Sequence, residues 1–315
     1  MRPTSGQMVN TWQPEMGESE EEQIASNSIP VLLEQLHPQI LTATRGSIDV
    51  DGIYGCALKA SVAKSFEFAA FSNQDPAPLH GFFITSSLRG ICEDLIAFSF
   101  LDALDPDDRN KALILLMDAN VSEGLEAQSN FFEEFRPWQP VVQPPKTPVS
   151  DPSVELRKLS RKLGWNGKNS WPSTWFMAKK SGLQFLYSYL YSATSKWVHF
   201  SPHILLRMGW GGDGKDRESL GSHTEWEFTT KNFSDYYKEF NQIYSVMLLL
   251  KLLRGPAMIL FSDELMEIID QLEDILDKPL RWPELVTYEE LNIEGPGVVH
   301  RLALQFIHEK KLEKP

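Results

Sequence analysis

The chain has 315 residues, of which 42% are hydrophobic and 23% are charged, so it is long enough to bury a substantial core. Its formal net charge of −13 favours solubility and opposes non-specific attraction to DNA or RNA unless basic residues gather on one face. Its two cysteines, Cys56 and Cys92, lie in apolar helical patterns and form no disulfide framework. This excludes a small disulfide-stapled scaffold and favours a reducing compartment.

The N-terminal segment is polar and acidic, and it lacks the basic and apolar regions of a signal peptide. We predict a disordered lead over residues 1–27, a helical core domain over residues 28–230 and a C-terminal helical subdomain packed on that core over residues 231–315. The most apolar run, residues 243–253, is too short to span a bilayer and is interrupted by Lys251. A cytoplasmic protein without membrane insertion is therefore expected.

In chain order, apolar residues recur with helical spacing between clear breaks. Helix starts are marked at Asp105, Asp151 and Ser201, where a capping side chain precedes a proline. The pattern predicts helices over residues 30–44, 53–72, 78–101, 107–135, 152–163, 173–199, 232–253, 263–276 and 298–310. Only residues 223–228 alternate like a strand. We therefore predict a mainly α, multi-helix globular bundle with at most one short β-hairpin.

Two of these helices carry polar residues in apolar surroundings. Arg89 and Glu93 lie four residues apart in the predicted helix 78–101, so they face the same way and need polar partners to offset desolvation. In the predicted helix 173–199, polar side chains recur every four residues and form one slowly winding stripe: Tyr187, Tyr191, Ser195 and His199. We predict that the two polar stripes meet inside the bundle.

Such a buried cluster has the side chains of a catalytic site. Glu93 would orient His199, His199 would act as a general base, and Arg89 would hold an anion, with Tyr191 and Ser195 beside them. A buried polar network that only fixes the register of the helices uses the same residue types. Both interpretations remain open at this point.

Basic residues gather in the predicted helix 152–163, near three tryptophans. The candidate nucleic-acid contacts are Arg157, Lys158, Arg161 and Lys162. The tryptophans are Trp165, Trp171 and Trp175. Cations that contact phosphates, together with rings that stack on bases, are typical of nucleic-acid binding. The alternative is a solvated helix face with ordinary core tryptophans.

Metal and nucleotide motifs are incomplete. His199 and His203 have the spacing of a shared zinc site, but a helix break at Ser201 and Pro202 separates them. The segment GWGGDGKD at residues 209–216 matches the Gly-x-x-x-x-Gly-Lys part of a phosphate-binding loop, yet Asp216 replaces the required Ser or Thr. We predict no bound metal and no cofactor.

Three segments resemble a bacterial family of unknown function, over roughly residues 61–292: SSLRGICEDLIAF, GLQFLYSYLYSATSKWVHFSPHIL and RWPELVTYEELN. The hallmark of that family is an Arg-x-x-x-Glu helix followed by a helix with Tyr, Ser and His. Arg89 and Glu93 match the first element. The second is matched by Tyr187, Tyr191, Ser195 and His199. The resemblance implies a fold but no reaction.

The chain is also distantly similar to the helical ribonuclease domains of prokaryotic toxin and antiphage systems, whose catalytic helix carries Arg-x(4 to 6)-His. Here Lys196 is the only basic residue in that window before His199, so Arg89 could supply the arginine only from another helix. Two hypotheses follow. The first is an enzyme of a defence or stress system that acts on nucleic acid or nucleotides. The second is a non-catalytic interaction or regulatory protein that binds a protein partner or a second copy.

Overall fold

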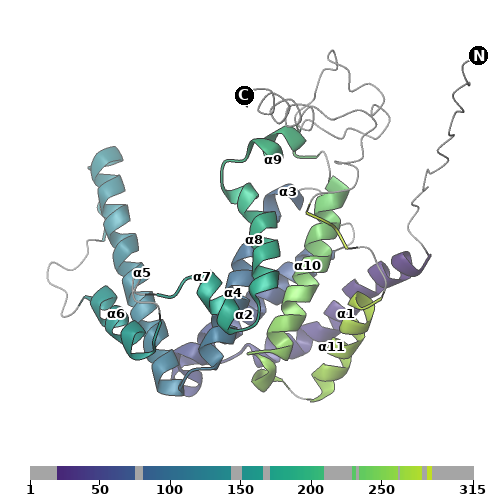
Figure 1. Cartoon of the computed structure of the whole chain (residues 1–315), viewed down its shortest axis with the longest axis horizontal. Helices are drawn as coiled ribbons and strands as arrows, with labels where there is room; N and C mark the ends of the chain where they lie inside the picture. The colour runs from purple at the N-terminus through teal and green to yellow at the C-terminus, as the bar shows by residue number, and fades with distance from the viewer. Residues whose placement is uncertain are drawn as a thin grey trace, which may run out of the picture.

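The computed structural model describes residues 20–74, 81–142, 151–165, 171–208, 229–231, 234–261, 263–278 and 282–285. Within these residues the regular elements are helices and no strand occurs, which confirms the predicted mainly α fold (Figure 1). The helices are α1 (Glu20–Ala43), α2 (Ile48–Ser72), α3 (Gly81–Ile84), α4 (Ser87–Asp102), α5 (Pro106–Phe135), α6 (Pro152–Lys162), α7 (Thr174–Lys180), α8 (Gln184–Val198), α9 (Pro202–Arg207), α10 (Ser234–Arg254) and α11 (Asp263–Leu276), with a short 3-10 helix at Met258–Leu260. In the described part of the chain, none of them is long and apolar enough to cross a membrane.

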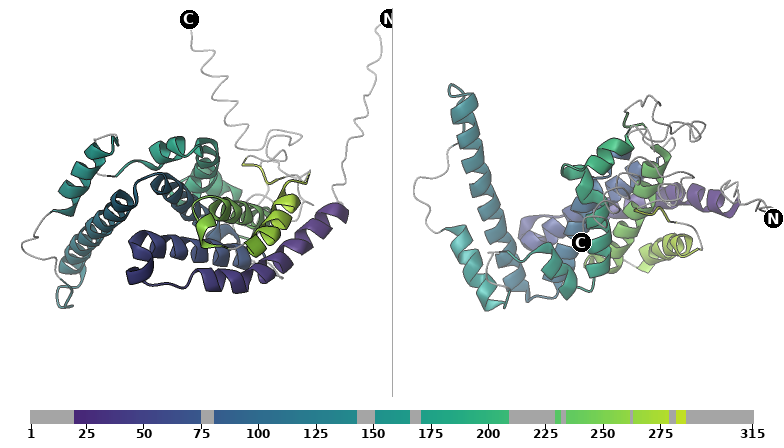
Figure 2. Two further views of the ribbon diagram at one scale, coloured as in Figure 1. Left: turned by 90° about the horizontal axis from the view of Figure 1, so that it is seen from below. Right: turned by 45° about the horizontal axis from the view of Figure 1, so that its top comes forward.

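Helix α10 forms the centre of the core and packs against α2, α3, α4 and α11. Its last turns bury apolar side chains in all directions: Val246, Leu248, Leu249, Leu250, Leu252 and Leu253. A helix enclosed by others accounts for this uninterrupted apolar run. Helices α1 and α11 pack together on one side of this core, while α7 and α8 pack on α4 (Figure 2). This packing holds α4 and α8 side by side.

Helix α5 projects from this body as an arm, with α6 beside its first half (Figure 1). Lys162 at the end of α6 pairs with Asp108 near the start of α5, and Leu156 and Leu159 are buried. Among the residues of α5, only Ala112 is buried. The second half of the arm therefore extends beyond the cover that α6 provides.

The predicted helix starts at Asp105 and Asp151 are confirmed. Each carboxylate accepts a hydrogen bond from the backbone N–H two residues later, as an N-cap does. The predicted start of a helix at residue 30 is wrong, because α1 begins at Glu20 and contains Pro30 and Pro38. Proline is typical of the first turn of a helix, but Pro30 and Pro38 lie inside α1.

The single helix predicted over residues 78–101 is also wrong, since α3 and α4 are separate. Thr85 follows α3, and both its hydroxyl and its backbone N–H donate to the carbonyl of Gly81. That carbonyl also accepts from Asn241 of α10, and a Cβ at Gly81 would lie 2.9 Å from Tyr237. The close approach to α10 thus fixes the position of α3.

The helix predicted over residues 173–199 is likewise divided, into α7 and α8. Gly182 lies between them with φ 73°, a left-handed conformation that strongly favours glycine. Helix α8 then ends at Val198, and His199 is its extended C-cap. The helical register that placed Ser195 and His199 on one stripe therefore ends before His199.

Several predictions lie outside the described residues. These are the hairpin at residues 223–228, the glycine-rich loop at residues 209–216 and the helix at residues 298–310. The proposed division at residue 231 stays a prediction, although α10 contributes to the same core as α2 and α4.

A candidate site between α4 and α8

Arg89 of α4 is the centre of a polar cluster that joins α4 to α8. Its Nε donates to Oε1 of Glu93 at 2.9 Å, and its Nη1 lies 3.4 Å from Nε2 of His199. Its guanidinium carbon lies 4.8 Å from the centre of the Tyr191 ring. These contacts agree with the predicted meeting of the two polar stripes for Arg89, whose side chain reaches Tyr191 and His199.

A guanidinium has only N–H donors, so in the contact with Arg89 the acceptor is Nε2 of His199. His199 is exposed, and it follows directly after the last residue of α8. An exposed imidazole is a group that can take a proton from a substrate.

Glu93 accepts a hydrogen bond from Arg89, whereas the sequence analysis predicted that Glu93 orients His199. The hydrogen bond from Arg89 to Glu93 is the first cause that raises the pKa of the guanidinium, so the arginine stays charged. Among the described residues, no contact joins Glu93 to His199. Glu93 is therefore placed to fix the direction of the Arg89 side chain.

The cluster is more open than the sequence predicted. The side chains of Arg89 and Glu93 are 24% and 36% exposed, and Tyr191 is 37% exposed. The apolar pattern of α4 had indicated a fully buried position, but the break between α3 and α4 and the turn after α8 leave this end of both helices accessible. A solute can therefore reach Arg89 and His199.

Aromatic rings continue the cluster along α8 and on to α7. The rings of Tyr191 and Tyr187 lie 5.2 Å apart, and those of Tyr187 and Trp175 lie 6.3 Å apart. Trp175 is 49% exposed, while burial raises the pKa of the Tyr187 hydroxyl above its ordinary value. The sequence analysis named Trp175 as a ring that could stack on bases beside the basic residues of α6, but it did not predict that Trp175 lies next to Tyr187.

Ser195 and Cys92 lie next to the cluster. Ser195 is half-buried, and the described residues show no hydrogen bond from its hydroxyl, although its carbonyl accepts from the His199 N–H. Cys92 is buried beside Glu93, and burial raises the pKa of its thiol to about 12. A thiol with that pKa is protonated at neutral pH and is a poor nucleophile.

The predicted nucleic-acid contacts lie elsewhere, on the solvent side of α6. Lys158 pairs with Glu155 and Lys162 pairs with Asp108, while Arg157 and Arg161 are exposed and have no ion pair among the described residues. Trp165 is a core residue against Phe100. The predicted stacking role of Trp165 is therefore wrong, and only part of the basic face is free to bind phosphates.

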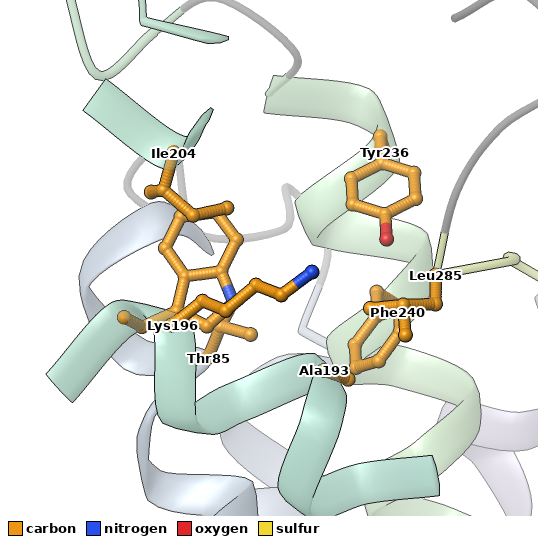
Figure 3. Close-up of a pocket in the computed structure, with 8 residues that line it drawn as sticks. Thr85, Ala193, Lys196, Ile204, Tyr236, Phe240 and Leu285 are labelled. Carbon is orange, nitrogen blue, oxygen red and sulfur yellow. The ribbon is translucent and has the colours of Figure 1, made fainter. Parts of the chain in front are cut away.

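A small hollow lies on the other side of α8 (Figure 3). It has a volume of about 320 Å³, open space included, and Lys196 and Tyr236 are among its lining residues. Neither it nor the groove between α8, α10 and α11, which has a volume of about 670 Å³, is lined by a residue of the predicted site. No group of three or more metal-binding side chains occurs among the described residues, and the side chain of His203 lies outside them.

The structure thus defines a helical protein with an accessible arginine–histidine site between two helices. Residues 84–216 match a family of unknown function, DUF5677. The matched segment contains α4 and α8, and so it includes Arg89, Glu93, Tyr191 and His199. The predicted resemblance to a family of unknown function is confirmed over this part of the chain. No curated protein and no solved structure matches.

Proposed function

We propose that the protein is an enzyme that cleaves RNA, with Arg89 and His199 at the reacting phosphodiester. The observation that carries this proposal is the contact of 3.4 Å between Arg89 Nη1 and His199 Nε2. The ribonuclease domains that the sequence is expected to resemble carry both residues on one helix. In this chain α4 supplies the arginine and α8 ends at the histidine, so the same pair of side chains is assembled from two helices.

The chemistry follows from the two groups. His199 takes the proton of a ribose 2′-hydroxyl through Nε2, which Arg89 releases when its guanidinium turns to the phosphate, and the 2′-oxygen attacks the adjacent phosphorus. The bond from phosphorus to the 5′-oxygen breaks, the leaving oxygen takes a proton from water, and a 2′,3′-cyclic phosphate remains. Arg89 stabilises the negative charge that develops on the phosphoryl oxygens. Glu93 is a positioning residue, since it holds the guanidinium in place.

The aromatic row supports a nucleic-acid substrate. Tyr191 exposes ring surface next to Arg89, and Trp175 exposes ring surface at the other end of the row. Bases of a single strand stack on such rings. The net charge of −13 repels a polyanion as a whole. Binding at this place therefore depends on the local arginine and on stacking.

The test is incubation of the purified full chain with labelled single-stranded RNA and with DNA of the same sequence, under several divalent metals and with none. We expect cleavage of RNA and not of DNA, and loss of cleavage in His199→Ala. The matched control is His37→Ala, which removes an exposed histidine of α1. Absence of RNA cleavage under every condition, or cleavage retained in His199→Ala, contradicts the proposal.

A second function, a non-catalytic interaction protein, is favoured by one observation. The arm formed by α5 exposes large apolar side chains, among them Phe131 and Phe135, as docking surfaces do. If the cluster around Arg89 is only structural, removal of Arg89 lowers stability strongly and no RNA is cut. In either case we propose a bacterial, cytoplasmic protein of a defence or stress system; the free cysteines Cys56 and Cys92 fit a reducing compartment.

A further inference from the structure

Helix α5 carries an apolar stripe that the described part of the chain leaves exposed. The large exposed residues are Ile114, Met117, Val121, Phe131 and Phe135. At 100° per residue they fall within about one third of the helix circumference. Between the first and the last of them the helix is about 32 Å long.

Acidic residues occupy the other side of the arm. Glu123, Glu126, Glu133 and Glu134 are exposed and lie roughly opposite the stripe by the same helical geometry. The charges beside the stripe differ in sign at its two ends, with Asp118 towards the body and Arg136 at the tip. Both are exposed, and within the described residues neither makes an ion pair.

We propose that this stripe is the interface of a homodimer, in which the α5 arms of two copies pack antiparallel. In that arrangement the tip of each arm meets the inner part of the other, so Asp118 of each copy faces Arg136 of its partner. A parallel pair would place like charges together at both ends. The four glutamates point away from the contact, so burying the stripe brings no acidic residues together.

Residues at the stripe suit a close helix pair. Phe131 and Phe135 form a ring contact at 4.9 Å and are 54% and 63% exposed. Gly124 lies near the middle of the stripe, and a Cβ there would meet nothing within 4 Å. The two arms can therefore approach each other closely at their crossing point, with the aromatic tip of each over Met117 and Val121 of the other.

The first experiment measures the mass of the full chain in solution by analytical ultracentrifugation. We expect a dimer for the wild type and a monomer for the double variant Phe131→Ser, Phe135→Ser. Because both side chains are exposed, the variant should keep its helical circular dichroism. Phe185→Ser is the matched control, since Phe185 is 82% exposed on α8, and it should remain dimeric.

The second experiment tests the antiparallel pairing. Asp118→Arg and Arg136→Asp each place like charges opposite each other in a homodimer, so each should weaken self-association at low salt. An equimolar mixture of the two variants restores both pairs, so it should form a heterodimer more tightly than either variant forms its own dimer.

Three results overturn the inference. They are a monomeric wild type at the highest soluble concentration, a dimer that survives the double substitution of Phe131 and Phe135, and a mixture of the charge variants that associates no better than its components. None of these outcomes depends on the proposed RNA cleavage.

Discussion

Replacement of Arg89 by Ala separates a functional site from a structural network, because the two roles predict different losses. The side chain makes a half-exposed ion pair with Glu93 four residues away, a cation–π contact with Tyr191 and one hydrogen bond with His199. An exposed pair of that spacing contributes about 0.3–0.5 kcal/mol, and the other two contacts contribute about 0.5–1 kcal/mol each. Arg89→Ala should therefore lower the free energy of unfolding by about 2 kcal/mol.

The expected loss of activity is much larger. Removal of one group that stabilises transition-state charge lowers the rate by about 10²–10³-fold. Urea unfolding followed by circular dichroism measures the loss of unfolding free energy, and kcat/KM on single-stranded RNA measures the loss of activity. Arg157→Ala, which removes an exposed arginine without an ion pair among the described residues, should change the unfolding free energy by less than about 0.5 kcal/mol.

The reasoning is refuted if Arg89→Ala costs about 4 kcal/mol or more, since breaking a buried pair costs about 3–5 kcal/mol. It is refuted equally if the variant keeps full activity on an RNA that the wild type cuts.

Three further outcomes are expected. Burial raises the pKa of the Cys92 thiol from 9.0 to about 12. The contribution of this thiol to the free energy of unfolding should therefore be constant below pH 9 and fall by up to about 4 kcal/mol as the pH rises towards 12. In urea titrations at alkaline pH, Cys92→Ala should lose less stability than the wild type, and an equal loss would contradict the prediction. Gly182→Ala should lower the free energy of unfolding by about 1 kcal/mol, because Gly182 has a positive φ. Asparagine tolerates that conformation better, so Gly182→Asn should have a melting temperature closer to that of the wild type. Identical melting temperatures of the two variants would argue against backbone strain. Trp175→Ala should weaken binding of single-stranded RNA, measured by fluorescence anisotropy, by about 1–3 kcal/mol, and the exposed Trp138 serves as the control; an equal effect of the two substitutions would remove the stacking role.

Local sequence signals predicted most of the fold. The apolar run of α10 and the capping aspartates of α5 and α6 act over a few residues, so they can be recognised without tertiary information. The break between α3 and α4 depends on the contact of Gly81 with Tyr237 and Asn241, which lie more than a hundred residues away along the chain. Such a break cannot be derived from local periodicity.

The site was predicted in part for the same reason. The spacing of Arg89 and Glu93 is a local property of one helix, and so is that of Tyr187 and Tyr191. His199, by contrast, contacts Arg89 from the C-cap of α8, outside the helical register used to predict the stripe. The degree of exposure depends on where neighbouring helices end, which explains why the predicted buried site is half-exposed.

The most direct test of the central claim is the chemistry of the new RNA end. Cleavage through a 2′-hydroxyl that His199 deprotonates should leave a 2′,3′-cyclic phosphate on the 5′ fragment, visible by mass spectrometry, and His199→Ala should give none. A 3′-hydroxyl end, or the same cyclic product from His199→Ala, would contradict the assignment of Arg89 and His199 to the reacting phosphodiester.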